Sequence, residues 1–261
     1  MKRKVLHLSF SSSGGAGRVA SQLVESQREL GWDSQLITLT ATNLRDDPLS
    51  LPMHTVLAGF DHAVVKKASF DGLVSLSRNL LSHSVKLNLN DADIVHLHWI
   101  NGVTSLENVL LAAPQAKIVW TMHDMNPFTG VCHQSFGCAG FANDCSSCPA
   151  VRSFARPAVM RALAKKVETY NRSQNLTVVA PSQWLYSLAS ESTAMSNVDI
   201  RFIPNPVRQL FSSDTVDPSN PGTTVCVQPN QQFCVIATDL HDPLKNIDFA
   251  VEAFAVLKVN N

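Results

Sequence analysis

The chain has 261 residues, of which 45% are hydrophobic, and its 21 basic Lys and Arg side chains balance 21 acidic ones. This composition suits one large or two moderate globular domains, and the neutral balance without a basic run argues against a nucleic-acid partner. No segment reaches the ~20 apolar residues of a membrane span, and the first apolar run, which His7 interrupts, is too short for a signal peptide. We therefore expect a cytoplasmic globular protein with reduced thiols.

Apolar, β-branched runs alternate with helix-length amphipathic segments along most of the chain. This alternation is typical of an α/β fold with a doubly wound parallel sheet, in which ligands bind at the carboxyl ends of the strands. In the first helix we expect Val19, Leu23 and Leu30 to face the sheet. The predicted strands cover residues 5–10, 34–40, 93–99, 117–122 and 176–181, and the predicted helices cover 17–30, 57–81 (one or two helices), 156–170 and the residues up to 188 after an N-cap at Ser182.

The composition changes after Phe211, which divides the chain into parts. Residues 212–232 are rich in Ser, Asp, Pro, Asn and Gln, as expected of a linker or surface loop. A strand is predicted over 233–239 and a helix over 245–258. Since a single strand and helix cannot bury their own faces, residues 233–261 are predicted to be the first βα unit of a second, incomplete domain that follows the domain of residues 1–211.

A glycine-rich turn joins the first predicted strand to the first helix. Gly14, Gly15 and Gly17 lie there in the segment SFSSSGGAGRVA. Glycines at a helix N-terminus let backbone N–H groups approach a phosphate. The spacing matches neither the dinucleotide fingerprint nor the P-loop, so a tight strand-to-helix turn fits equally well.

Histidines follow two of the predicted strands. His96 and His98 share a face of the third strand, and Trp99 comes next, so these side chains could hold a sugar by hydrogen bonds and stacking. We favour a functional role for His98, nearer the strand end, and consider His96 a core histidine as the alternative. His123 and Asp124 follow the fourth strand at the ligand edge, and Asp124 could instead cap the turn.

A cysteine-rich segment of roughly two dozen residues without a clear helix follows His123, which is long for a loop in a compact domain. Cys132, Cys138, Cys145 and Cys148 have the spacing C-x5-C-x6-C-x2-C, with His133 as a substitute ligand. The last pair has the spacing of a zinc site and the first pair is wider. A structural zinc would hold the loop, whereas free thiols or a disulfide are the alternatives.

The order of these pieces resembles the N-terminal half of family 4 glycosyltransferases with the GT-B fold, particularly bacterial exopolysaccharide and lipopolysaccharide enzymes. The resemblance covers nearly the whole chain. It rests on SFSSSGGAGRVASQL, DIVHLHW, VWTMHDMNPFTGVCHQSFGCAGFANDCSSCP, VVAPSQWL, RFIPNPV and, at the opening of the donor domain, DLHDPLKNIDFAVEAF.

The resemblance implies retaining transfer of a sugar from a nucleotide-sugar donor to a saccharide or lipid-linked saccharide acceptor in surface polysaccharide biosynthesis. It gives His123 the catalytic position beside the donor sugar, and Gly14, Gly15 and Lys245 contacts with the donor phosphates. The acceptor side would take His98, Trp99 and Asp124. Such enzymes require no catalytic metal, and cationic and N–H groups stabilise the leaving diphosphate.

The sequence departs from the family pattern in its second domain, because the acidic E-x7-E motif has no counterpart here. We therefore expect a truncated protein with little transferase activity by itself. The alternative is a non-catalytic binding or scaffold protein with a zinc-stapled cysteine loop. A membrane partner is a further question: residues 57–87 carry Lys66, Lys67, Arg78 and Lys86 beside apolar positions, which suits either an anionic inner-membrane surface or a helix that covers the sheet.

Overall fold

The computed structural model describes residues 2–38, 73–75, 89, 91–101, 104–206 and 245–259. Contacts divide the chain into two units, residues 1–208 and 209–261. In the second unit the described part is mainly helix α7 (Ile247–Val259), which agrees with the helix predicted there. The predicted linker, the predicted strand over 233–239 and the basic positions of the 57–87 segment lie outside the described residues.

The first unit contains a six-stranded sheet in which every neighbouring pair of strands is parallel, in the order β2-β1-β3-β4-β5-β6. This confirms the predicted α/β fold. The last strand was not predicted, because it carries a short charged sequence and is mostly exposed at the sheet edge. The strands are β1 (Lys4–Ser9), β2 (Asp33–Thr38), β3 (Ile94–Leu97), β4 (Lys117–Thr121), β5 (Leu176–Ala180) and β6 (Asp199–Phe202).

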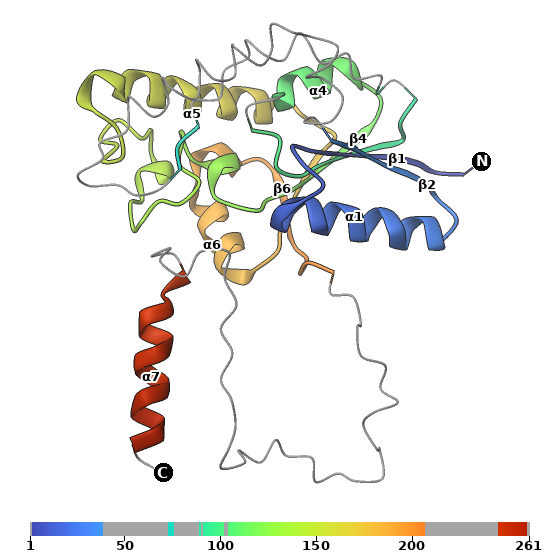
Figure 1. Cartoon of the computed structure of the whole chain (residues 1–261). Coiled ribbons are helices and arrows are strands. Elements are labelled where there is room, and N and C mark those ends of the chain that lie inside the picture. The colour runs from blue at the N-terminus through green and yellow to red at the C-terminus, as the bar shows by residue number, and fades with distance from the viewer. Residues whose placement is uncertain are drawn as a thin grey trace, which may run out of the picture. The chain divides into compact units, whose positions relative to one another are not determined.

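Helices cover both faces of this sheet, with α4 and α5 on one face and α1 and α6 on the other (Figure 1). The helix bounds are α1 (Gly14–Glu29), α4 (Leu106–Ala112), α5 (Arg156–Asn171) and α6 (Gln183–Glu191). Short 3-10 turns follow β4 and precede β6: η2 (Asn126–Phe128), η3 (Gly140–Ala142), η4 (Ser153–Ala155) and η5 (Thr193–Met195). The Ser182 side chain accepts a hydrogen bond from the Leu185 N–H, which confirms the predicted N-cap of α6.

The first helix differs from its prediction at both ends. It begins at Gly14 rather than Gly17, so the glycines form its first turn. It ends before Gly31, whose φ of 82° favours glycine. Leu30 is 74% exposed at the C-cap, so the prediction that it faces the sheet was wrong. The buried face carries Gly17, Ala20 and Val24, one position removed from the face predicted.

One main core lies between the sheet and its helices. On the face toward α5, alternate strand residues such as Leu97, Ile118 and Trp120 are buried, because successive side chains of a strand point to opposite faces. Trp120 packs edge-on against Tyr170 of α5, with ring centroids 6.2 Å apart. On the opposite face β1 and β3 carry His7 and His96, and these histidines contribute to the site. No helix in the described ranges is long and apolar enough to cross a bilayer.

Candidate functional site

The site lies at the carboxyl edge of the sheet, where β1 pairs with β2 on one side and β3 on the other. The chain runs from β1 to β2 and then returns past β1 to β3, so the strand order reverses between β1 and β3. Ligands in doubly wound sheets bind at such a switch point. His7 of β1 pairs in register with His96 of β3, which puts two imidazoles side by side at that point.

A row of side chains leads from α1 across the sheet to His123. The Nε2 atom of His7 lies 2.9 Å from Oε1 of Gln27, and its Nδ1 atom lies 3.1 Å from Nε2 of His98. The Nδ1 atom of His98 lies in turn 3.1 Å from Nε2 of His123. His7 and His98 are buried, whereas His123 is half-buried at the open end of the row. Hence His98 is connected to the edge of the sheet through His123.

Burial keeps these imidazoles neutral. Burial lowers the pKa of His7, with the hydrogen bond to Gln27 opposing the change. Burial, followed by repulsion from the neighbouring imidazoles, lowers the pKa of His98 far below its usual range. Burial lowers the pKa of His123 to about 4, although Asp124 favours its charged form. At neutral pH each ring therefore offers one N–H donor and one lone pair.

His96 is a satisfied histidine beside this row. Its Nε2 atom lies 2.8 Å from Oγ1 of Thr121 on β4, and its ring stacks on His98 with centroids 4.4 Å apart. Burial lowers the pKa of His96 well below its usual value. The structure thus favours the alternative that the sequence left open for His96.

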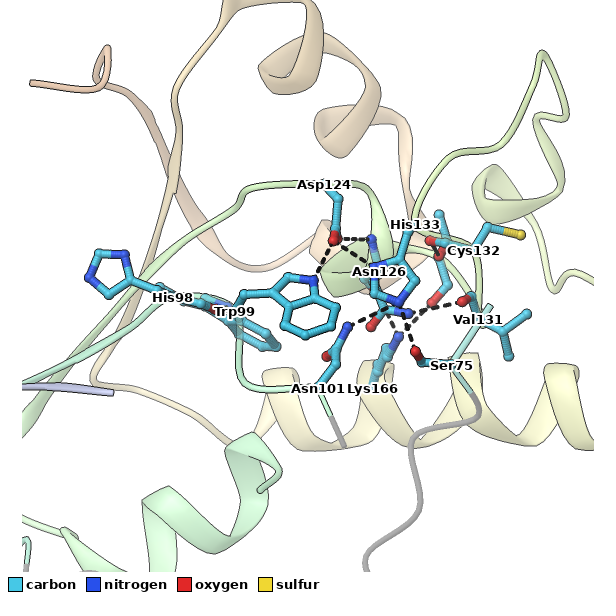
Figure 2. A network of polar contacts seen from close by, with 12 residues as sticks. Ser75, His98, Trp99, Asn101, Asp124, Asn126, Val131, Cys132, His133 and Lys166 are labelled. Carbon is cyan, nitrogen blue, oxygen red and sulfur yellow. Dashed lines mark hydrogen bonds and ion pairs between the residues drawn. The ribbon is translucent and has the colours of Figure 1, made fainter. Parts of the chain in front are cut away.

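Asp124 is the centre of a second polar network, in which Trp99 and His133 lie on either side of its carboxylate (Figure 2). Its Oδ2 atom accepts hydrogen bonds from Nε1 of Trp99 at 2.7 Å and from Nδ1 of His133 at 2.6 Å. Its Oδ1 atom accepts the N–H of Asn126 at 2.8 Å, so Asp124 does cap the turn after β4. The carboxylate therefore holds the end of β3, the turn after β4 and the start of the cysteine segment together.

His133 continues the second network. Its Nε2 atom lies 2.8 Å from Oγ of Ser75 and 3.3 Å from Nδ2 of Asn101 (Figure 2). Because Asp124 takes the Nδ1–H, Nε2 carries the lone pair and accepts from both partners. Both nitrogens of His133 are engaged, so this side chain is a poor substitute ligand for zinc. The row of carboxylate, imidazole and hydroxyl has the order of a hydrolase triad, but we interpret it as a tie between segments, since Asn101 shares the same lone pair.

A buried lysine on α5 holds the segment that follows β4. The Nζ atom of Lys166 donates to the backbone carbonyls of Asn126 at 2.6 Å and Thr129 at 2.8 Å. The Tyr170 hydroxyl donates to the carbonyl of Pro127 at 2.6 Å. Burial lowers the pKa of Lys166 to about 8. These bonds satisfy three backbone carbonyls of the irregular segment that follows β4.

A pocket with an empty volume of about 560 Å³, its mouth included, opens beside this network between α4 and α5. It reaches the site through Asn101 and Asn126. Amide groups and the aromatic faces of Trp120 and Tyr170 line the same space, a combination that suits a sugar.

The glycine turn leaves the N-terminus of α1 open. A Cβ atom added at Gly14 or Gly15 would have no neighbour within 4 Å, and no side chain caps the helix. Gly17 differs, because a Cβ there would come within 2.3 Å of the Ser11 carbonyl oxygen. Gly17 thus serves packing, and the first two glycines leave room for an anion. Lys245 belongs to the other unit, where it is exposed just before α7.

The four cysteines are all free thiols. A hydrogen bond between Cys132 and Cys148 lowers the pKa of Cys148 and raises that of Cys132. A Cβ atom built on Gly140 would lie 3.4 Å from Sγ of Cys138 and 3.8 Å from Sγ of Cys145, so these two sulfurs face one spot. Within the described residues, however, the group of metal-type ligands within mutual reach is His7, His96 and His98. The zinc site stays a prediction.

Sequence reasoning found His98, Trp99, His123 and Asp124, which the structure places at one edge. It missed Gln27, His7 and Lys166, and it named His133 only as a substitute zinc ligand. His7 had one usable signal, since a histidine inside the first apolar run of a parallel sheet must find a partner. Gln27 and Lys166 had none, because polar residues on a helix usually face water.

The sequence of this chain is similar to those of known proteins. Residues 13–208 match the model of Glycosyltransferase Family 4, and because this is more than half of the chain, the protein belongs to that family. The family match confirms the resemblance found in the sequence. A 64-residue stretch is 33% identical to the "Putative colanic acid biosynthesis glycosyl transferase WcaC" of Escherichia coli (strain K12). This stretch covers 23% of this chain and 16% of that protein. The match thus spans only a small part of that relative's length.

Proposed function

We propose that this chain acts in a retaining glycosyltransferase, which moves a sugar from a nucleotide-sugar donor to a saccharide or lipid-linked saccharide acceptor in surface polysaccharide biosynthesis. The observation that carries the proposal is the half-buried, neutral His123 at the carboxyl edge of β4, held by an ordered row of side chains. In the same family the sugar transfer develops positive charge on the donor sugar and negative charge on the leaving diphosphate.

The roles of the other residues follow from their places. Gly14 and Gly15 bind donor phosphate through the open N–H groups of α1, since no side chain caps that end. Trp99 and Asp124 shape the acceptor side, and the pocket beside Asn101 and Asn126 extends it. The family resemblance assigns Lys245 to the donor diphosphate. We expect the proposed reaction to need no catalytic metal.

Replacing His123 tests the donor contact. We expect His123→Ala to weaken nucleotide-sugar binding about tenfold in calorimetric titrations, because one hydrogen bond to the sugar is lost. His123→Gln should retain most of the affinity, since its amide can both donate and accept. Leu111→Ala, at a side chain 75% exposed on α4, is the matched surface control. An unchanged affinity in His123→Ala would remove this residue from the donor site.

A structural zinc in the cysteine loop is a separate proposal. The shared hydrogen bond of Cys132 and Cys148 and the pair of sulfurs facing Gly140 support it. We expect freshly purified protein to contain about one zinc per chain, which Cys148→Ser should lower. Zinc below a tenth of that in wild-type protein purified without chelators would contradict the proposal.

The alternative function is a non-catalytic binding or scaffold protein with this stapled loop. The two cysteine pairs are the observation that favours it. It predicts zinc without nucleotide-sugar binding, so the same titrations and metal measurements separate the two functions.

A further inference from the structure

The row of imidazoles starts from a side chain with a fixed hydrogen-bonding role. The Oε1 atom of Gln27 accepts the hydroxyl of Ser34 at 2.7 Å and lies 2.9 Å from Nε2 of His7. An amide oxygen can only accept. The Nε2 atom of His7 must therefore carry its hydrogen.

This assignment propagates along the row, because a neutral imidazole has one N–H and one lone pair. The Nδ1 atom of His7 is left as an acceptor, so Nε2 of His98 donates to it over 3.1 Å. The Nδ1 atom of His98 then accepts the Nε2–H of His123 over 3.1 Å. At the open end, Nδ1 of His123 keeps a lone pair, which accepts no hydrogen bond from a side chain in the described part of the chain.

We propose that Gln27 is a positioning residue that acts through His7 and His98 to fix His123 as the Nε2–H tautomer, so that Nδ1 of His123 accepts a hydrogen bond from a sugar hydroxyl. This inference rests on the proposed function and narrows it. A lone pair repels a phosphate oxygen and attracts a hydroxyl, so His123 meets the sugar of the donor rather than its diphosphate. The row also ends in an amide, which does not take up a proton at neutral pH. It therefore orients His123 and conducts no proton away.

A metal ion is the competing explanation for the same side chains. His7, His96 and His98 each offer one nitrogen, and these atoms lie within 4.8 Å of one another. In a metal site, however, imidazoles radiate from one point with their lone pairs aimed at it. Here His96 and His98 stack with an interplanar angle of 25°, as do His7 and His98 at 20°. The His7 and His98 nitrogens moreover point at each other as donor and acceptor. The geometry favours the hydrogen-bonded row.

The tautomers can be measured directly on the whole ¹⁵N-labelled chain without any donor. Long-range ¹H–¹⁵N spectra at pH 7.5 distinguish an imidazole protonated at Nε2 from one protonated at Nδ1, and single His→Gln variants assign the signals. We expect His7, His98 and His123 all to be the Nε2–H tautomer. A His123 protonated at Nδ1 would overturn the proposal, because the row would then run in the opposite direction. A stoichiometric metal bound by the three histidines would overturn it as well.

Gln27→Met tests whether Gln27 determines the tautomer of His123. We expect the His123 signals to change to those of mixed tautomers, and nucleotide-sugar affinity to fall by up to about tenfold. Gln22→Met is the control, because it makes the same change on α1 at a side chain that forms no hydrogen bond within the described residues. It should leave the His123 signals and the nucleotide-sugar affinity unchanged. Unaltered His123 signals in a folded Gln27→Met variant would refute the coupling. If that variant fails to fold, the wild-type tautomers still decide. Correct tautomers without nucleotide-sugar binding would refute the proposed function alone.

Discussion

Lowering the pH from 7.5 to 5 is expected to remove about 4 kcal/mol or more from the free energy of unfolding. His96, His98 and His123 have pKa values lowered by burial, to about 4 for His123, whereas an unfolded histidine titrates near 6.5. Below pH 6.5 the unfolded state therefore binds protons that the folded state does not, so stability falls as the pH falls. At pH 5 His98 and His123 each contribute about 2 kcal/mol to this loss, and His96 adds to it in the same direction. Since whole domains are stable by about 5–15 kcal/mol, the protein should be marginal there.

Urea unfolding followed by tryptophan fluorescence at pH 7.5, 6 and 5 measures this effect. His123→Gln removes one of the titrating groups, so its stability should depend on pH less steeply, by about 1.4 kcal/mol per pH unit. Toward pH 4 the contribution of His123 to the pH dependence of stability should level off first, because its pKa in the folded state is about 4. A free energy of unfolding that is constant from pH 7.5 to 5 would show that the imidazoles are not held neutral.

Asp124→Ala is expected to destabilise the protein by about 3–5 kcal/mol at pH 7.5, because each buried donor left without its acceptor costs about 1–3 kcal/mol. The substitution leaves three donors without their acceptor: Nε1 of Trp99, the N–H of Asn126 and Nδ1 of His133. The carboxylate is only 19% exposed, so water replaces it poorly. The same urea unfolding experiments measure the loss.

Asp144→Ala is the matched control, because Asp144 lies in the same segment and also accepts a backbone N–H, from Ser146 at 2.9 Å. Its side chain is exposed, so its removal should change stability little. Asp124→Asn retains one acceptor oxygen and should fall between the two. Equal effects of Asp124→Ala and Asp144→Ala would mean that the second network does not hold the segment.

The sequence predicted the elements whose pattern is local and strong. The apolar runs of β1 and β3 to β5 stand out because both faces of a central parallel strand are covered. The strand β6 has no such pattern, because it lies at the edge of the sheet, pairs only with β5 and is mostly exposed. The histidines after β3 and β4 could be found from their positions at the ends of predicted strands. Gln27 could not, because it contacts His7 only through the packing of α1 on the sheet.

The cysteine segment shows a different limit. Its composition indicated an unusual loop, but some of the interactions that fix the loop come from α5, which follows it in the chain. The Lys166 ammonium and the Tyr170 hydroxyl bind backbone carbonyls, and backbone groups have no residue-specific signature. Spacing alone therefore could not distinguish a loop held by metal from one held by a neighbouring helix.

Gly17, in the first turn of α1, affects the position of the whole helix. Its missing side chain lets α1 approach the Ser11 carbonyl more closely than any other residue would. Gln27 lies ten residues further along, about 15 Å away at the rise of an α-helix. A methyl group added at Gly17 is therefore expected to displace α1, and with it the amide of Gln27 that contacts His7. The alignment of His123 would then depend on a residue that touches neither the ligand nor any histidine of the row.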